Sequence, residues 1–152
     1  MKIKKTFQKL TSAKGTLESS HMLKSYLGEK VYSRSGDVVG TLKDIVLKKN
    51  ALEGIIVKTG FRSKIFIGKD YIKELTPVTM MLSIDPVTSL VGKYVFDADG
   101  KKLGVVTELK RSTDANNYQG IYVRKHRFSK PMYIKKEAVE IAKKNIILSE
   151  TY

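Results

Sequence analysis

The sequence predicts a mainly β fold, in which two tandem small β-barrels with short helical turns follow a basic N-terminal tail. Three observations support this prediction. Residues 31–40 recur in altered form as residues 95–104, and internal repetition is typical of repeated modules. From residue 27 onward, short β-like runs alternate with turn residues, as expected for small all-β domains. The chain has 152 residues, a length that suits two small domains.

The repeat continues past this first pair of segments. Gly36 and Gly40 correspond to Gly100 and Gly104, an offset of 64 positions. The offset grows to 66 or 67 in later pairs, as loop insertions would cause: residues 53–55 with 119–121, 65–67 with 132–134, and 82–83 with 148–149. We assign residues 1–25 to the tail, 26–86 to the first barrel and 87–152 to the second. Each copy is near the lower size limit for a self-sufficient core, so we expect the copies to pack on each other or on a partner.

Glycines mark the turns and the strands that follow them. Gly36 and Gly100 are predicted to lie in hairpin turns, because glycine readily takes a positive φ. Gly40 and Gly104 fall early in the next strand. A glycine there indicates a bulge or a close backbone approach, as needed where a small barrel bends.

The remaining elements follow in the same order in both copies. In the first copy we predict strands at residues 41–47, 54–57 and 65–67, a helical turn at 69–75 and a closing strand at 80–84. In the second copy we predict strands at residues 120–123 and 132–134, a helical turn at 135–142 and a closing strand at 146–149. Asp85 and Pro86 mark the linker, since proline ends a strand and disfavours helix before it.

The N-terminal tail allows two interpretations. If residues 2–13 are helical, Ile3, Phe7 and Leu10 share one face and the lysines share the other. A basic amphipathic helix of this kind lies on anionic membrane surfaces. The other interpretation is a disordered leader. The longest apolar runs, such as residues 78–82, are far too short to span a bilayer, so we expect a cytoplasmic protein without a transmembrane segment.

The chain is strongly basic, with a net charge of +14. Residues 1–26 contribute +5 (six basic, one acidic), residues 27–88 contribute +3 (ten and seven), and residues 89–152 contribute +6 (thirteen and seven). Such a surface attracts nucleic acid, anionic lipid and acidic proteins alike. Lysine greatly outnumbers arginine, which disfavours specific readout of base edges.

Residues for catalysis or metal binding are scarce. The chain has no cysteine and only two histidines, His21 and His126, so the usual nucleophile–base pairs are scarce and thiolate metal sites are excluded. Residues 97–100 resemble the start of a calcium loop, but Gly100 comes too early for that motif. We therefore expect no enzyme activity, no metal site and no cofactor.

Two surfaces are candidates for binding. The closing strands are apolar, and a closing strand that leaves a free edge can recruit a strand from a partner; the candidate partner-binding residues are Met80, Met81, Ile146, Ile147 and Leu148. The second surface is a basic segment between Tyr122 and Tyr133. It could hold single-stranded RNA or another anion by charge and stacking, through Arg124, Lys125, Arg127 and Lys130.

The glycine and strand pattern resembles the PRC-barrel family, known from the photosynthetic reaction-centre H subunit and from the ribosome-maturation factor RimM. The resemblance rests on Gly28, Gly36 and Gly40, on the strand at residues 54–57, and on residues 68–72. It is repeated from Gly92 to residue 139. The separate N-terminal barrel of RimM has no counterpart here.

A chain of two such barrels is similar to archaeal PRC-barrel proteins of FtsZ-based cell division, which act with the membrane anchor SepF. The resemblance implies a non-enzymatic adaptor that binds a SepF-type anchor or a sibling PRC-barrel protein, as a homodimer or heterodimer, at the division site near the membrane. The alternative implied by RimM is an RNA-binding or ribosome-assembly module.

Overall fold

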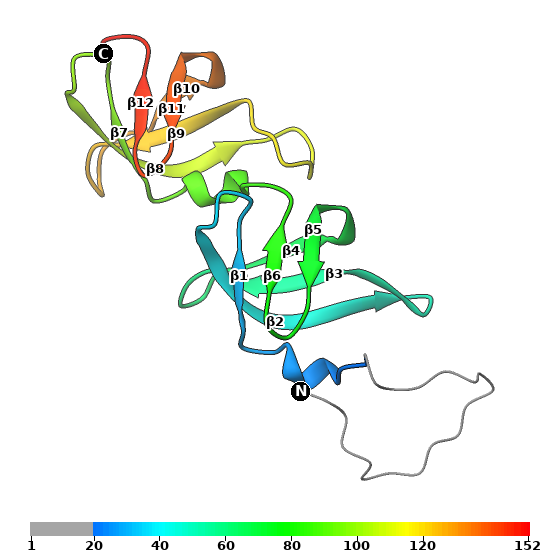
Figure 1. Ribbon diagram of the computed structural model, residues 1–152. Helices are drawn as coiled ribbons and strands as arrows, with labels where there is room; N and C mark the ends of the chain where they lie inside the picture. Colours follow the sequence, from blue (N-terminus) through cyan, green and yellow to red (C-terminus); the bar gives the residue numbers. More distant parts are fainter. Residues whose placement is uncertain (1–19) are drawn as a thin grey trace, which may run out of the picture. The chain divides into compact units, whose positions relative to one another are not determined.

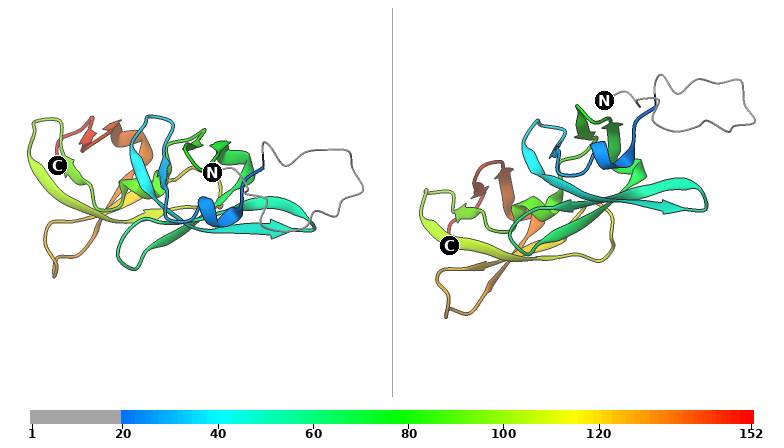
Figure 2. Two further views of the ribbon diagram at one scale, coloured as in Figure 1. Left: turned by 60° about the horizontal axis from the view of Figure 1, so that its bottom comes forward. Right: turned by 90° about the horizontal axis from the view of Figure 1, so that it is seen from below.

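A computed structural model describes residues 20–152, which form two units that divide between Asp85 and Pro86 (Figure 1). Each unit contains one six-stranded sheet, and the strand order is the same in both. Each sheet curls back on itself, as Figures 1 and 2 show, and the buried side chains of each unit form their own apolar core. The predicted fold class, mainly β with two tandem small barrels, is confirmed.

The first unit begins with a short 3₁₀ helix, η1 (Leu23–Ser25). Its strands are β1 (Lys30–Tyr32), β2 (Val38–Lys48), β3 (Ala51–Lys58), β4 (Lys64–Gly68), β5 (Ile72–Leu75) and β6 (Met80–Leu82). A second 3₁₀ helix, η2 (Lys69–Tyr71), connects β4 to β5. The order in the sheet is β4-β3-β2-β1-β6-β5, with β1 and β6 parallel and the other neighbours antiparallel.

The second unit repeats this arrangement after the 3₁₀ helix η3 (Val87–Leu90). Its strands are β7 (Tyr94–Phe96), β8 (Lys102–Lys110), β9 (Gly120–Arg124), β10 (Met132–Lys135), β11 (Val139–Ala142) and β12 (Ile146–Leu148). The 3₁₀ helix η4 (Lys136–Ala138) connects β10 to β11. The order is β10-β9-β8-β7-β12-β11, and β7 pairs in parallel with β12.

Alternation of buried and outward-facing residues along the strands builds each core. Val31 and Val95, the central residues of β1 and β7, are fully buried and lie beside Met80 and Ile146 on the parallel neighbours. Burying one such side chain contributes about 1.5–3 kcal/mol. Because successive side chains of a strand point to opposite faces of the sheet, the residues next to Val31 and Val95 point away from the core.

The glycines act as the sequence predicts. Gly36 and Gly100 take positive φ angles of 87° and 82° in the β1–β2 and β7–β8 turns. Gly40 and Gly104 lie so close to the neighbouring strand that an added Cβ would collide with the backbone carbonyls of Lys58 and Arg124. A side chain at either position would force adjacent strands apart.

The predicted helical turns are too long. Three-residue 3₁₀ helices start at Lys69 and Lys136, but the second half of each predicted segment is a strand, β5 or β11. These strands are short, and they form because β6 and β12 offer antiparallel partners. Pairing that depends on a distant partner leaves a weak signal in the local sequence.

Candidate interaction surfaces

The closing strands do not have the free edges expected from the sequence. β6 lies between β1 and β5, and β12 lies between β7 and β11, so both strands are paired on both sides. β6 pairs in parallel with β1, on the side of β1 that β2 does not occupy, and β12 pairs in parallel with β7 in the same way. The edge strands are instead β4 and β5 in the first barrel and β10 and β11 in the second.

The side chains of these strands divide between core and surface. Met80, Ile146 and Leu148 are buried and belong to the two cores. Only Met81 and Ile147, at equivalent positions in the two copies, face outward. Of the five candidate partner-binding residues, these two are therefore the ones that a partner could touch.

Ile147 lies in a row of apolar side chains on the outer face of the second barrel. It pairs with Ile141 on β11 and with Phe96 on β7. Tyr94, two residues before Phe96, points to the same face. Ile141, Ile147 and Tyr94 are 40%, 36% and 47% exposed, and Phe96 is half-buried. We call Tyr94, Phe96, Ile141 and Ile147 the outer stripe.

The first barrel has a different surface at the same ladder positions. Met81 pairs with Glu74 on β5 and with Tyr32 on β1, so Glu74 is the counterpart of Ile141. Lys30 is the counterpart of Tyr94. Two charged residues of the first barrel are thus replaced by apolar or aromatic residues in the second. Direct comparison of the two copies at these positions would have revealed this difference in the sequence.

Lys102 borders the outer stripe. It pairs with Phe96 across the β7–β8 ladder, and its ammonium nitrogen lies 3.8 Å from the centroid of the Tyr94 ring. At this distance the cation attracts the face of the ring. Its counterpart in the first barrel is Val38. At this one position the first barrel therefore has the apolar residue and the second barrel has the charged one.

The predicted basic segment forms the β9–β10 connection. Lys125, Arg127 and Lys130 are exposed, and Arg124 is half-buried at the end of β9. The flanking rings of Tyr122 and Tyr133 are cross-strand partners, with centroids 5.2 Å apart and an interplanar angle of 47°.

Tyr133 also covers a glycine. An added Cβ on Gly120 would meet the Tyr133 ring, and the same relationship joins Gly54 to Phe66 in the first barrel. An aromatic ring over a strand glycine protects backbone that the glycine leaves bare. One face of Tyr133 is therefore occupied within the protein.

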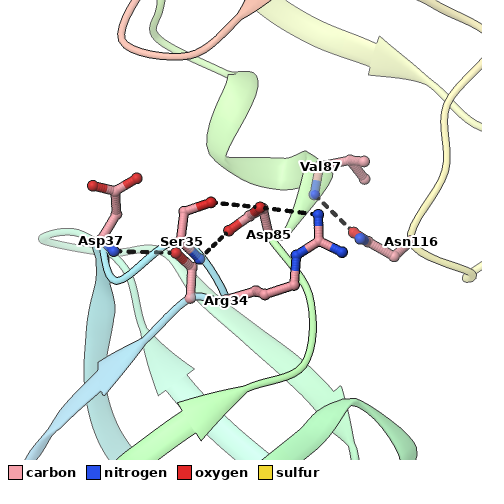
Figure 3. Close-up of polar contacts among 7 residues, drawn as sticks. Arg34, Ser35, Asp37, Asp85, Val87 and Asn116 are labelled. Carbon is pink, nitrogen blue, oxygen red and sulfur yellow. Dashed lines mark hydrogen bonds and ion pairs between the residues drawn. The ribbon is translucent and has the colours of Figure 1, made fainter.

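A carboxylate fastens the end of the first barrel to its β1–β2 turn (Figure 3). Asp85 accepts hydrogen bonds from the backbone N–H of Ser35 at 2.9 Å and from the Ser35 hydroxyl at 2.8 Å. The Arg34 guanidinium lies 3.6 Å away. Burial raises the pKa of Asp85, but the hydrogen bonds from Ser35 and Ser33 and the charge of Arg34 outweigh it, and the pKa falls below its ordinary value.

In the second barrel the carboxylate is on the turn itself. The buried Asp97 accepts hydrogen bonds from the backbone N–H groups of Asp99 at 3.0 Å, Lys101 at 2.9 Å and Tyr152 at 3.3 Å. Burial raises the pKa of Asp97, but these hydrogen bonds and the charge of Lys101 outweigh it, and the pKa falls below its ordinary value. The residues that resembled a calcium loop thus form a hairpin turn. A further side-chain bond, from Val87 N–H to the Asn116 amide oxygen at 2.8 Å, holds the start of this barrel.

The predicted membrane-surface residues Ile3, Phe7 and Leu10 lie outside the described residues. Within residues 20–152, no helix has the length and apolar character to cross a membrane. In the same part of the chain, no three His, Asp or Glu side chains are grouped so that they could hold a metal ion.

A comparison with known protein families finds the same domain twice in the chain, in agreement with the duplicated sheet topology. The model of the PRC-barrel domain matches twice, at residues 21–87 and 83–152. The chain belongs to the PRC-barrel family. A search of curated proteins gave no match. PRC-barrel domains are not enzymatic folds, and two of them in tandem fit an interaction or adaptor module.

Proposed function

We propose that this PRC-barrel protein is a non-enzymatic adaptor that binds a protein partner through the outer stripe of its second barrel. The observation that carries the proposal is the difference between the copies. Where the first barrel exposes Lys30 and Glu74, the second exposes Tyr94 and Ile141 at the same ladder positions. The fold tolerates charge at these positions, so folding alone does not require the apolar residues.

The stripe has the composition of a small interface centre. Its members are neighbours on three adjacent strands, β11, β12 and β7, and aromatic residues are enriched in interface centres. Lys102, whose ammonium lies over the Tyr94 ring, supplies a basic group at the border of the stripe. Burying one such half-exposed side chain contributes at most about 1.5–3 kcal/mol, and association itself is costly. A partner with an apolar patch and an acidic rim would satisfy this surface.

The resemblance to archaeal division proteins supports a specific partner. It favours a SepF-type anchor, or a sibling PRC-barrel protein, and supports an adaptor that acts in the cytoplasm, at an FtsZ-based division site near the membrane. A second copy of this chain would use the same stripe to form a dimer. RNA binding, suggested by RimM, would use the β9–β10 basic segment and leave the stripe free.

The test is a titration of the full chain with a purified SepF-type anchor, in which calorimetry measures the binding. Sedimentation of the chain alone measures its self-association. We expect saturable binding that is lost in Ile141→Glu/Tyr94→Lys, which gives the second barrel the residues of the first. Met81→Lys, an outward-facing change in the first barrel, is the control. No binding of the anchor and no self-association would overturn the proposal.

A further inference from the structure

The same hairpin in both barrels ends in a fully exposed phenylalanine beside an arginine. Phe61 lies in the β3–β4 connection and Phe128 in the β9–β10 connection, and each is 88% exposed. Arg62 and Arg127 lie against these rings, each with its guanidinium carbon 5.8 Å from the ring centroid. Figure 2 shows the orange β9–β10 hairpin extending beyond the rest of its own barrel.

The two tips contain the same four residue types in nearly the same order. Residues 61–64 read Phe-Arg-Ser-Lys, and residues 127–130 read Arg-Phe-Ser-Lys. Residues 58–64 contain three basic and no acidic residues, and residues 124–130 contain four basic and no acidic residues. The copies have diverged around these tips, yet both keep an aromatic residue among cations.

Hydrogen bonds hold the tips in shape. In the first tip, Thr59 N–H donates to the Ser63 carbonyl at 2.9 Å. In the second, the Ser129 hydroxyl donates to the His126 carbonyl at 2.8 Å, and the Ser129 N–H donates to the same carbonyl at 3.0 Å. A tip that is already ordered loses little conformational entropy when it binds. The exposed rings are therefore presented on formed turns.

The shape and chemistry of these tips suit a bilayer surface. A projecting apolar ring can enter the boundary between headgroups and acyl chains, while the lysines and arginines around it reach lipid phosphates. A single nucleic-acid strand is held differently, in a basic groove where successive bases stack on several aromatic rings. Here each tip carries a single phenylalanine, the second tip adds only the imidazole of His126, and Tyr122 and Tyr133 pack against each other.

We propose that the β3–β4 and β9–β10 tips dock the protein onto anionic phospholipid membranes by inserting Phe61 and Phe128. Each tip consists of residues other than those of the outer stripe, so an adaptor with both would hold a protein partner at a lipid surface. It uses folded residues of the barrels and does not depend on the N-terminal tail.

The absence of tryptophan from the chain allows a direct test in the full-length protein. Phe61→Trp and Phe128→Trp each place one fluorescent reporter at a tip. Val78→Trp is the matched control, because Val78 is 90% exposed in the β5–β6 connection, where residues 76–79 carry no charge. The probes are vesicles of phosphatidylcholine with and without phosphatidylglycerol.

We expect both tip reporters to shift to shorter wavelength with anionic vesicles, and to be quenched by brominated acyl chains, while the Val78→Trp reporter stays unchanged. Neutral vesicles should have little effect. No response at either tip would overturn the proposal. A response to single-stranded RNA without a response to vesicles would also overturn it, in favour of nucleic-acid binding.

A second variant separates insertion from general attraction of charge. Phe61→Ser/Phe128→Ser keeps the net charge of +14 and removes only the two exposed rings, so the melting temperature should not change. We expect sedimentation with anionic vesicles to weaken about tenfold or more. Unchanged sedimentation would show that the tips do not insert. Ile141→Glu/Tyr94→Lys should sediment as the wild type does, whether or not the proposed adaptor function holds.

Discussion

Asp97 stands in the second barrel where Ser33 stands in the first, and each accepts a hydrogen bond from the backbone N–H four residues later. The Ser33 hydroxyl accepts from Asp37 at 3.2 Å, and the Asp97 carboxylate accepts from Lys101 at 2.9 Å. Both side chains are buried. The same turn is thus closed by a neutral group in one copy and by a charged group in the other.

Each barrel also uses a carboxylate to hold the segment that follows its closing strand, although this carboxylate comes from a different place in the chain in the two copies. Asp85 follows β6 and reaches back to the β1–β2 turn, whereas Asp97 lies on the β7–β8 turn and reaches forward to Tyr152. The backbone bonds beside them match: Arg34 N–H donates to the Ile84 carbonyl and Ala98 N–H to the Glu150 carbonyl. Each carboxylate therefore fastens the segment after the closing strand to the first turn of its barrel.

Replacing Asp97 by Asn should destabilise the second barrel. An amide keeps one oxygen for Lys101, but its NH₂ group would face the N–H of Tyr152, and two donors cannot satisfy each other. We expect a melting temperature lower by a few degrees, measured by circular dichroism. The exposed Asp99 gives the control variant, Asp99→Asn. Equal melting temperatures for the two variants would show that the carboxylate of Asp97 adds nothing.

The stabilising effect of Asp97 should disappear in acid. Its pKa is lowered in the folded protein from an ordinary value of 3.8, so folding favours the ionised form. The contribution is complete above pH 3.8 and is lost as the pH falls through the lower folded-state pKa. In urea titrations, the difference in unfolding free energy between wild type and Asp97→Asn should shrink below pH 3.8. A difference that stays constant, or grows, in acid would contradict this assignment.

Alanine at the close-approach glycines should be costly. In Gly40→Ala and Gly104→Ala the new methyl group would meet the carbonyl of the adjacent strand, Lys58 or Arg124. Overpacking of this kind typically costs about 1–3 kcal/mol, measurable by urea denaturation. Gly68→Ala is the matched control for Gly40→Ala, because Gly68 has φ −65° and an added Cβ there meets nothing within 4 Å; at Gly104 a φ of 149° adds backbone strain to the collision. A loss of similar size in Gly68→Ala would mean that a general glycine effect, and not strand contact, is being measured.

The sequence predicts features that depend on neighbouring residues better than features that depend on distant pairing. The turns at Gly36 and Gly100 and the tight approach at Gly40 and Gly104 leave local signals, and the structure confirms them. The position of β12 between β7 and β11 leaves none, because β7 lies about 50 residues earlier in the chain. The edge predicted at residues 146–148 was wrong for this reason.

The candidate surfaces show the same limit. Residues 80–82 and 146–148 are continuous apolar runs, so the sequence does not show that Met81 and Ile147, at the centre of each run, face outward while their neighbours are buried. The outer stripe gathers residues from three strands, so no short motif contains it. The repeat pairs Ser33 with Asp97 in the sequence, but it does not show their common role, because a hydroxyl and a carboxylate differ in chemistry and yet accept a hydrogen bond from the same backbone position.

Exchanging the surfaces of the two barrels should move partner binding from one to the other. Ile141→Glu/Tyr94→Lys removes the apolar centre of the outer stripe, and Lys30 and Glu74 already occupy the same sites in the first barrel, so folding should survive. We expect affinity for the SepF-type anchor to fall at least tenfold, because burial of two half-exposed side chains is lost. Calorimetry measures the affinity, and circular dichroism checks the fold.

The reciprocal variant makes this experiment decisive. Lys30→Tyr/Glu74→Ile in the first barrel, combined with the second-barrel exchange, should restore part of the binding if the stripe itself is recognised. Ile147→Lys in the wild-type background should weaken binding, whereas Met81→Lys should not, because only the first of these lies in the stripe. Equal weakening by Ile147→Lys and Met81→Lys would point to charge repulsion at any site. Full binding by Ile141→Glu/Tyr94→Lys would place the interface on another face.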